Sequence, residues 1–184
     1  CVIRAALNGN VYGIVTSAIY GACMVTMYTI SSVYHGLKPN LGKKVMQVVD
    51  HCAIYFLISG TYTPILLGAF LPVYPSTAWV FLALQWGLCI TAAVLTAIDL
   101  KKYKAFSMAC YICMGWSIIA VPKKCIQVMT AEGFTLLLAG GIAYTIGAVL
   151  YGCGKKKPIF HTVFHLFVDL GCLLQALCIL LYVL

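Results

Sequence analysis

The sequence predicts an all-α fold, a polytopic bundle of transmembrane helices. The chain is 63% hydrophobic and 9% charged, and its mean hydropathy is +1.01, whereas a soluble domain contains roughly 25% charged residues. Long apolar stretches recur along the chain, and each is close to the roughly 20 residues that a helix needs to cross a bilayer. We therefore exclude a soluble domain and expect membrane lipids as the surroundings and partners of the protein.

Six apolar stretches predict six spans within a single membrane domain, residues 1–184. Asp50 and Asp169 are the only residues with a formal charge inside these stretches. Residues 1–8 read like the end of an earlier element, and the chain does not begin with Met, so we expect it to be truncated at its N-terminus. The predicted spans cover residues 12–34, 45–70, 77–98, 105–122, 133–154 and 158–184.

Individual residues characterise several of these spans. In span 45–70, Pro64 removes a backbone hydrogen bond and should kink or loosen the helix. Nearby hydroxyls at 61–63 can satisfy the freed backbone groups in lipid. Trp79 begins the next span as an interfacial anchor. Span 133–154 carries small residues at four-residue steps, which allow another helix to approach closely: Ala139, Ala143 and Gly147.

The cations predict how the spans are oriented. If successive loops alternate between the two sides, nine cations fall on one side and three on the other, and the side with nine should be cytoplasmic. Because the cations lie in short loops and no soluble domain presents them, we do not expect a nucleic-acid partner. The nine are Lys38, Lys43, Lys44, Lys101, Lys102, Lys104, Lys155, Lys156 and Lys157, and the three are Arg4, Lys123 and Lys124.

Three of the four histidines lie where they could share a metal ion near the cytoplasmic face. His161 and His165 are four residues apart and therefore share a helix face. His35 closes the first span before the basic loop 38–44, and Asp50 follows that loop. Three neutral imidazoles with an open fourth position are the ligand set of a catalytic zinc site, and a neighbouring carboxylate can hold and deprotonate the bound water.

Two alternatives concern these ligands and their neighbours. His35 and His161 could instead be interfacial residues that hydrogen-bond water or lipid head groups. Ser31 lies four residues before His35 and could bond a group beside the site, although a serine in a span more often bonds a carbonyl of its own helix. His51 points about 100° away from Asp50 on a helix, so we interpret it as interfacial.

Asp169 extends the line of His161 and His165 by another four residues. It could accept the second ring N–H of His165, as carboxylates do for many metal-bound histidines. Alternatively, it could be a protonated side chain that bonds across helices. The sequence does not decide between these two interpretations.

Ten cysteines occur in the chain, mostly inside apolar spans at irregular spacing. A disulfide framework is not indicated by such a distribution, and these residues are expected to pack as small apolar side chains. Cys110 and Cys113 form a C-x-x-C pair, but no second pair or histidine is near them in the sequence.

Three segments closely resemble the hemolysin III family. The resemblance extends through residues 110–116 and 138–144, so it covers nearly the whole chain. That family is related to the progestin and adiponectin receptor family and, more distantly, to alkaline ceramidases. The segments are SSVYH at 31–35, DHCAIYFLISGTYTP at 50–64 and HTVFHLFV at 161–168.

The resemblance implies a seven-helix membrane protein with zinc near its cytoplasmic face, bound by the side chains here numbered His35, His161 and His165. It implies that Asp50 holds the zinc-bound water, and Ser31 is the serine of the family's S-x-x-x-H motif. The family's first helix, with its acidic motif, is missing from this chain. Asp169 stands where an apolar residue is expected.

Two functions are compatible with these features. The first is a zinc-dependent hydrolase of lipid amide or ester bonds, with Asp50 and Ser31 as catalytic residues. The second is a non-enzymatic receptor-like or membrane-perturbing, cytolytic protein with a structural zinc. Asp50 favours the enzyme, because a structural site needs no base beside an open position, but Asp50 could itself be a fourth ligand. We expect an integral protein of the bacterial plasma membrane with its metal site towards the cytoplasm.

Overall fold

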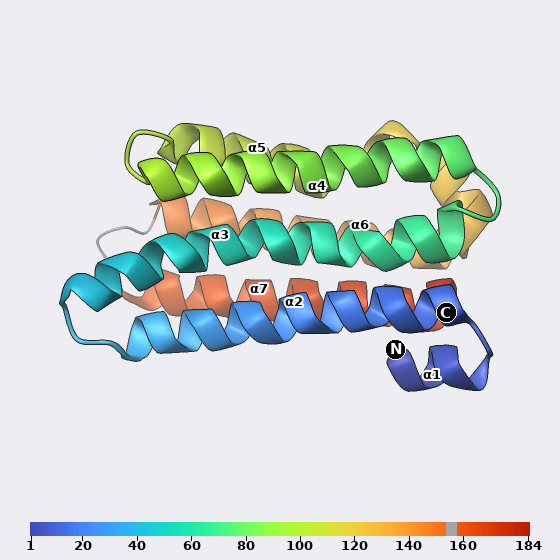
Figure 1. The fold of residues 1–184 in the computed structure, drawn as a ribbon, viewed down its shortest axis with the longest axis horizontal. Coiled ribbons are helices and arrows are strands. Elements are labelled where there is room, and N and C mark those ends of the chain that lie inside the picture. Colours follow the sequence, from blue (N-terminus) through green and yellow to red (C-terminus); the bar gives the residue numbers. More distant parts are fainter. Residues whose placement is uncertain (154–157) are drawn as a thin grey trace. The chain divides into compact units, whose positions relative to one another are not determined.

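The predicted spans are helical in the computed structural model, which describes residues 1–153 and 158–184, with side chains described outside 151–158 and 161 (Figure 1). No strand occurs in this described part, which confirms the all-α class. The helices are α1 (Val2–Leu7), α2 (Val11–Gly36), α3 (Leu41–Pro64), α4 (Pro75–Ile98), α5 (Lys104–Trp116), α6 (Pro122–Cys153) and α7 (Pro158–Cys178), with π-helices η1 (Ile65–Phe70) and η3 (Ile179–Val183) and the 3-10 helix η2 (Ser117–Ala120).

Five helices are long and apolar enough to cross a membrane, and they correspond to five of the six predicted spans. They are Val11–Gly36, Leu41–Phe70, Pro75–Ile98, Pro122–Leu150 and Thr162–Val183. The remaining prediction, 105–122, corresponds to the shorter apolar helix Lys104–Ala120. Its thirteen α-helical and four 3-10 residues rise about 27 Å, which approaches the hydrocarbon thickness of about 30 Å.

The described helices form two compact units. The N-terminal unit is Val2–Ser117, and the C-terminal unit is Ile118–Leu184 together with Cys1. In the N-terminal unit, α2, α3, α4 and α5 follow one another with short connections at alternate ends (Figure 1). The loop between α2 and α3 and the turn between α4 and α5 therefore lie at the same end of this unit.

The connection between α2 and α3 is shorter than the predicted basic loop, because α3 already begins at Leu41. The side chain of Asn40 caps this helix by accepting a hydrogen bond of 2.8 Å from the Lys43 N–H. Lys43 Nζ donates to the Leu37 carbonyl at 2.8 Å, where α2 ends. Lys43 and Lys44 thus belong to the first turn of α3, and Asp50 lies about 14 Å along the helix from Leu41.

The proline in α3 alters the helix as the sequence predicts. Directly after Pro64 the chain continues as the π-helix η1. The neighbouring threonine hydroxyls bond carbonyls of their own helix, Thr61 to Leu57 and Thr63 to Ser59, both at 2.8 Å. These acceptors are not the Gly60 carbonyl, which loses its helical donor at Pro64, so the described hydrogen bonds do not show the expected satisfaction of that group by the hydroxyls. The segment stays helical and largely buried through Phe70.

The helix α6 contains a break that the sequence did not reveal. Thr130 has φ 63° and ψ 171°, and it divides α6 into residues 122–129 and 131–153. The Thr130 hydroxyl accepts from the Gly133 N–H at 3.5 Å and donates to Glu132 Oε2 at 2.7 Å, as an N-cap of the second part. The segment before residue 133, expected to link two spans, is thus largely helical.

Glycines bring α6 and α7 into close contact. A Cβ built on Gly140 would lie 2.7 Å from Gln175 Cγ and 3.1 Å from the Gly171 carbonyl oxygen. A Cβ built on Gly133 would lie 2.8 Å from Tyr182 Cβ of η3, and one built on Gly147 would lie 3.1 Å from Phe167 Cβ of α7. Gly147 belongs to the predicted small-residue stripe, and together with Gly133 and Gly140 it forms a series at seven-residue steps, which keeps one seam of α6 against a partner helix.

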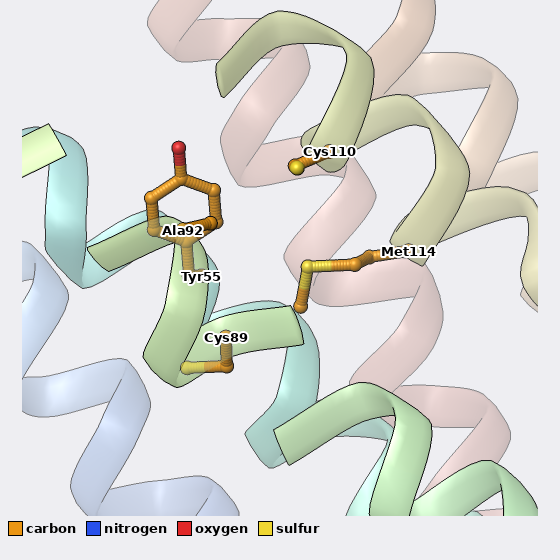
Figure 2. Packing of buried hydrophobic residues seen from close by; sticks show 5 residues of the cluster. All are labelled: Tyr55, Cys89, Ala92, Cys110 and Met114. Carbon is orange, nitrogen blue, oxygen red and sulfur yellow. The ribbon is translucent and has the colours of Figure 1, made fainter. Parts of the chain in front are cut away.

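In the N-terminal unit, α3, α4 and α5 meet around a buried cluster (Figure 2). Two of its members are thiols, and the described cysteines are free, so they serve as apolar packing groups as expected. The cluster consists of Tyr55, Cys89, Ala92, Cys110 and Met114.

Candidate metal centre

The N-terminal unit carries His35, Asp50 and Ser31 on two neighbouring helices. His35 is the penultimate residue of α2, and its exposed ring lies against Tyr34, with 4.7 Å between ring centroids. Asp50 lies on α3 and is half-buried. The first turns of α3 extend past the end of α2 (Figure 1). The rise along α3 therefore carries Asp50 back towards the end of α2.

Ser31 and Asp50 have side chains without a hydrogen bond to any described residue. Most threonines in these helices behave differently; Thr16, for example, bonds the Tyr12 carbonyl of its own helix at 2.7 Å. The bond to its own helix carbonyl that would occupy the Ser31 hydroxyl is thus not formed within the described chain.

His51 is tied to its own helix. Its Nδ1 lies 2.8 Å from the Gln47 carbonyl oxygen, and because a carbonyl only accepts, this bond requires a proton on Nδ1. The residue is half-buried. Its interpretation as an interfacial residue stays a prediction.

The C-terminal unit carries His161, His165 and Asp169 on α7. The backbone of α7 continues unbroken from Pro158 to Cys178, which keeps the four-residue spacing on one helix. The His165 ring is half-buried and lies against Phe164, with 5.2 Å between centroids. The side chain of His161 and residues Lys155 to Lys157 lie outside the described part. Asp169 is exposed and bonds no described residue, so its role towards His165 stays a prediction.

The predicted residues lie on helices of two different units: Ser31, His35 and Asp50 on α2 and α3, and His161, His165 and Asp169 on α7. Among the residues that the structure describes, no three His, Cys, Asp or Glu side chains gather closely enough to hold a metal ion. The chemistry of the donor set nevertheless fits zinc, which binds imidazole nitrogens and carboxylate oxygens. The assignment of His35, His161, His165 and Asp50 to one centre stays a prediction.

Sequence reasoning missed the residues that fix α3 beside Asp50. Tyr111 on α5 donates its hydroxyl to the His51 carbonyl at 2.9 Å, and its ring packs on Tyr55 with centroids 4.5 Å apart. The Tyr55 hydroxyl lies 3.1 Å from that of Thr96, which lies 3.0 Å from that of Ser107. The available signal was weak: hydroxyl residues scattered through apolar spans, with no spacing that pairs them.

Comparisons with known proteins show which sequences this chain is similar to. The family model described as Haemolysin-III related matches residues 1–176. Hemolysin-3 from Bacillus cereus is 37% identical over 183 residues, which cover 100% of this chain and 82% of that protein. The chain belongs to the hemolysin III family.

Other relatives of this hemolysin III protein extend the comparison. The Hemolysin-3 homolog of Bacillus subtilis (strain 168) is 34% identical over 181 residues, covering 98% of this chain and 83% of the relative. The human monocyte to macrophage differentiation factor is 26% identical over 171 residues, covering 88% and 68%. No solved structure matches the chain. With its apolar helices, the family membership makes the chain an integral membrane protein.

Proposed function

We propose that this hemolysin III protein binds one zinc ion through His35, His161 and His165 and hydrolyses amide or ester bonds of membrane lipids. The proposed location is the bacterial plasma membrane, with the metal site towards the cytoplasm. Bacillus relatives support the bacterial location. The orientation rests on the lysines at the α2–α3 and α4–α5 connections of the N-terminal unit.

Asp50 carries the proposal. An ionisable side chain inside an apolar helix is energetically expensive and is by default a functional group. Asp50 is half-buried, and no described residue hydrogen-bonds its carboxylate, so packing and hydrogen bonding among the described residues do not account for it. A catalytic base that acts on a bound reactant would account for a carboxylate at this position.

Zinc, when bound, would polarise the scissile carbonyl and make a water molecule acidic enough to attack it. Asp50 would accept the proton of that water and pass it to the leaving group. Ser31, on α2 and four residues before His35, would orient the reactants through its unengaged hydroxyl. The apolar faces of the helices suit a substrate that enters from the bilayer, which is why we name a lipid.

A second candidate is a membrane-perturbing or receptor-like protein in which zinc is purely structural. The name Hemolysin-3, borne by the Bacillus cereus relative, favours cytolysis. In this case Asp50 would be a fourth ligand that closes the site, as structural zinc sites are closed. The two candidate functions therefore assign Asp50 different roles, a catalytic base in the first and a zinc ligand in the second.

The deciding experiment compares Asp50→Asn with wild type for zinc content and for fatty-acid release from amide and ester lipids. If Asp50 is a base, the variant keeps most of its zinc and hydrolyses about 10²–10⁴-fold more slowly. If Asp50 is a ligand, zinc and thermal stability fall together. Asp99→Asn is the matched control, because Asp99 only accepts the backbone N–H groups of Lys101 and Lys102 at 3.0 Å, as asparagine also can. Zinc-loaded wild-type protein that cleaves no lipid in a broad panel contradicts the hydrolase.

A further inference from the structure

Two hydrogen bonds, each from a tyrosine hydroxyl to a backbone carbonyl, connect α5 to α3 at different positions along α3. The Tyr111 hydroxyl of α5 donates to the His51 carbonyl of α3 at 2.9 Å. The Tyr62 hydroxyl of α3 donates to the Gly115 carbonyl of α5 at 2.8 Å. One bond is one residue from Asp50, whereas the Tyr62 backbone lies twelve residues, about 18 Å, from Asp50 along α3. The α5 helix supplies none of the proposed zinc ligands.

The Tyr111 bond has its own support within the N-terminal unit. The Tyr111 ring packs on Tyr55 at 4.5 Å between centroids and 30° between planes. Tyr55 is fully buried in the cluster of Figure 2. Its hydroxyl continues the hydrogen-bonded series through Thr96 of α4 to Ser107 of α5. Residues 51–55 of α3 are thereby fixed from two neighbouring helices.

The orientation of this part of α3 controls where the Asp50 carboxylate lies. Side chains reach about 5–6 Å from a helix axis, so a rotation of about 10° moves a carboxylate by about 1 Å. A displacement of about 1 Å can slow an enzymatic reaction by about 10²-fold. Asp50 directly precedes His51, whose carbonyl accepts the Tyr111 hydroxyl at 2.9 Å, so this bond acts on the turn that carries the carboxylate.

We propose that Tyr111 is a positioning residue: its bond to the His51 carbonyl fixes the turn of α3 that carries Asp50, and thereby aims the carboxylate at the reacting water. This role rests on the proposed function, because the reacting water of that proposal is the group at which the Asp50 carboxylate is aimed. Tyr55, held by Thr96, supports the Tyr111 ring. Tyr62 makes an equivalent bond too far from Asp50 to have this effect.

The test compares Tyr111→Phe with the matched control Tyr62→Phe in the full chain loaded with Co²⁺ in place of zinc. Each variant loses one hydroxyl-to-carbonyl bond between α3 and α5. We expect Tyr111→Phe to keep its metal content, to change the visible absorption bands of Co²⁺, and to lower kcat about 10-fold at unchanged KM. Tyr62→Phe should leave the bands, kcat and KM as in wild type.

Identical Co²⁺ bands in wild type and Tyr111→Phe overturn the positioning role and leave the proposed function standing. Equal changes in both variants also overturn it, because they indicate a general loss of packing. If wild type binds Co²⁺ but hydrolyses no lipid, the proposed reaction fails while the bands still decide the role of Tyr111. Failure of wild type to bind Co²⁺ overturns both. Should Tyr111→Phe not fold, Thr96→Val, which removes the hydrogen-bond partner of Tyr55, should change the Co²⁺ bands relative to wild type, and unchanged bands overturn the role.

Discussion

The contact between α6 and α7 gives a stability prediction that can be worked from the structure. In Gly140→Ala, the new Cβ would lie 2.7 Å from Gln175 Cγ and 3.1 Å from the Gly171 carbonyl oxygen. The glutamine can rotate away, but the carbonyl belongs to the backbone of α7, so the helices must separate. Overpacking of this kind costs about 1–3 kcal/mol, and alanine regains up to about 1 kcal/mol of helix propensity.

Gly21→Ala is the matched control, because the added Cβ would meet nothing within 4 Å. The control should gain the helix propensity without the clash, so the two variants should differ by roughly 2 kcal/mol. In thermal unfolding, this corresponds to a Tm about 4–8 °C lower for Gly140→Ala. Equal Tm values for the two variants would refute the close approach of α6 and α7.

Three further outcomes are expected. With single cysteines introduced on a cysteine-free background, position 38 should label from the cytoplasmic side and position 123 from the outside; labelling from the same side contradicts the six-span topology. Asp169→Asn should weaken zinc about 10-fold to 100-fold if Asp169 bonds His165, and equilibrium zinc titration with unchanged affinity favours an interhelical role. Thr130→Gly should raise stability by about 1 kcal/mol, since only glycine readily adopts the Thr130 backbone conformation and glycine is nearly as good an N-cap. Thr130→Ala, which keeps the strain and loses the cap, should lower stability in the same unfolding assay, and the reverse order would argue against strain.

The helices could be predicted from the sequence because each apolar stretch is long enough to cross lipid. Inside a bilayer, a helix is one of the few structures that satisfy all backbone hydrogen bonds. Their ends were less predictable. Lys43 and Lys44 look like loop residues, yet charged side chains are tolerated in a helical turn outside the membrane, and α3 begins at Leu41. The helical turns after Pro122 were missed because the segment is too short and too polar to read as a span.

For the candidate site, too, some features could be predicted from the sequence and others could not. His35, Asp50, His161 and His165 could be named because few residues in the chain carry this chemistry, and so their positions stand out. The support of Asp50 by Tyr111 could not be predicted, since it depends on the register between α3 and α5, which neither helix encodes alone. The same holds for the glycine contacts with Gln175, which depend on how α6 and α7 pair.

The central claim is that His35, His161 and His165 bind one zinc ion. Elemental analysis of gently purified protein tests it most directly, with His165→Ala as the test variant and His51→Ala as the control, because the His51 ring already bonds the Gln47 carbonyl. We predict about one zinc per chain in wild type and in His51→Ala, as expected of a single three-imidazole site, and little zinc in His165→Ala. Metal-free wild-type protein, or full zinc content in His165→Ala, would contradict the account.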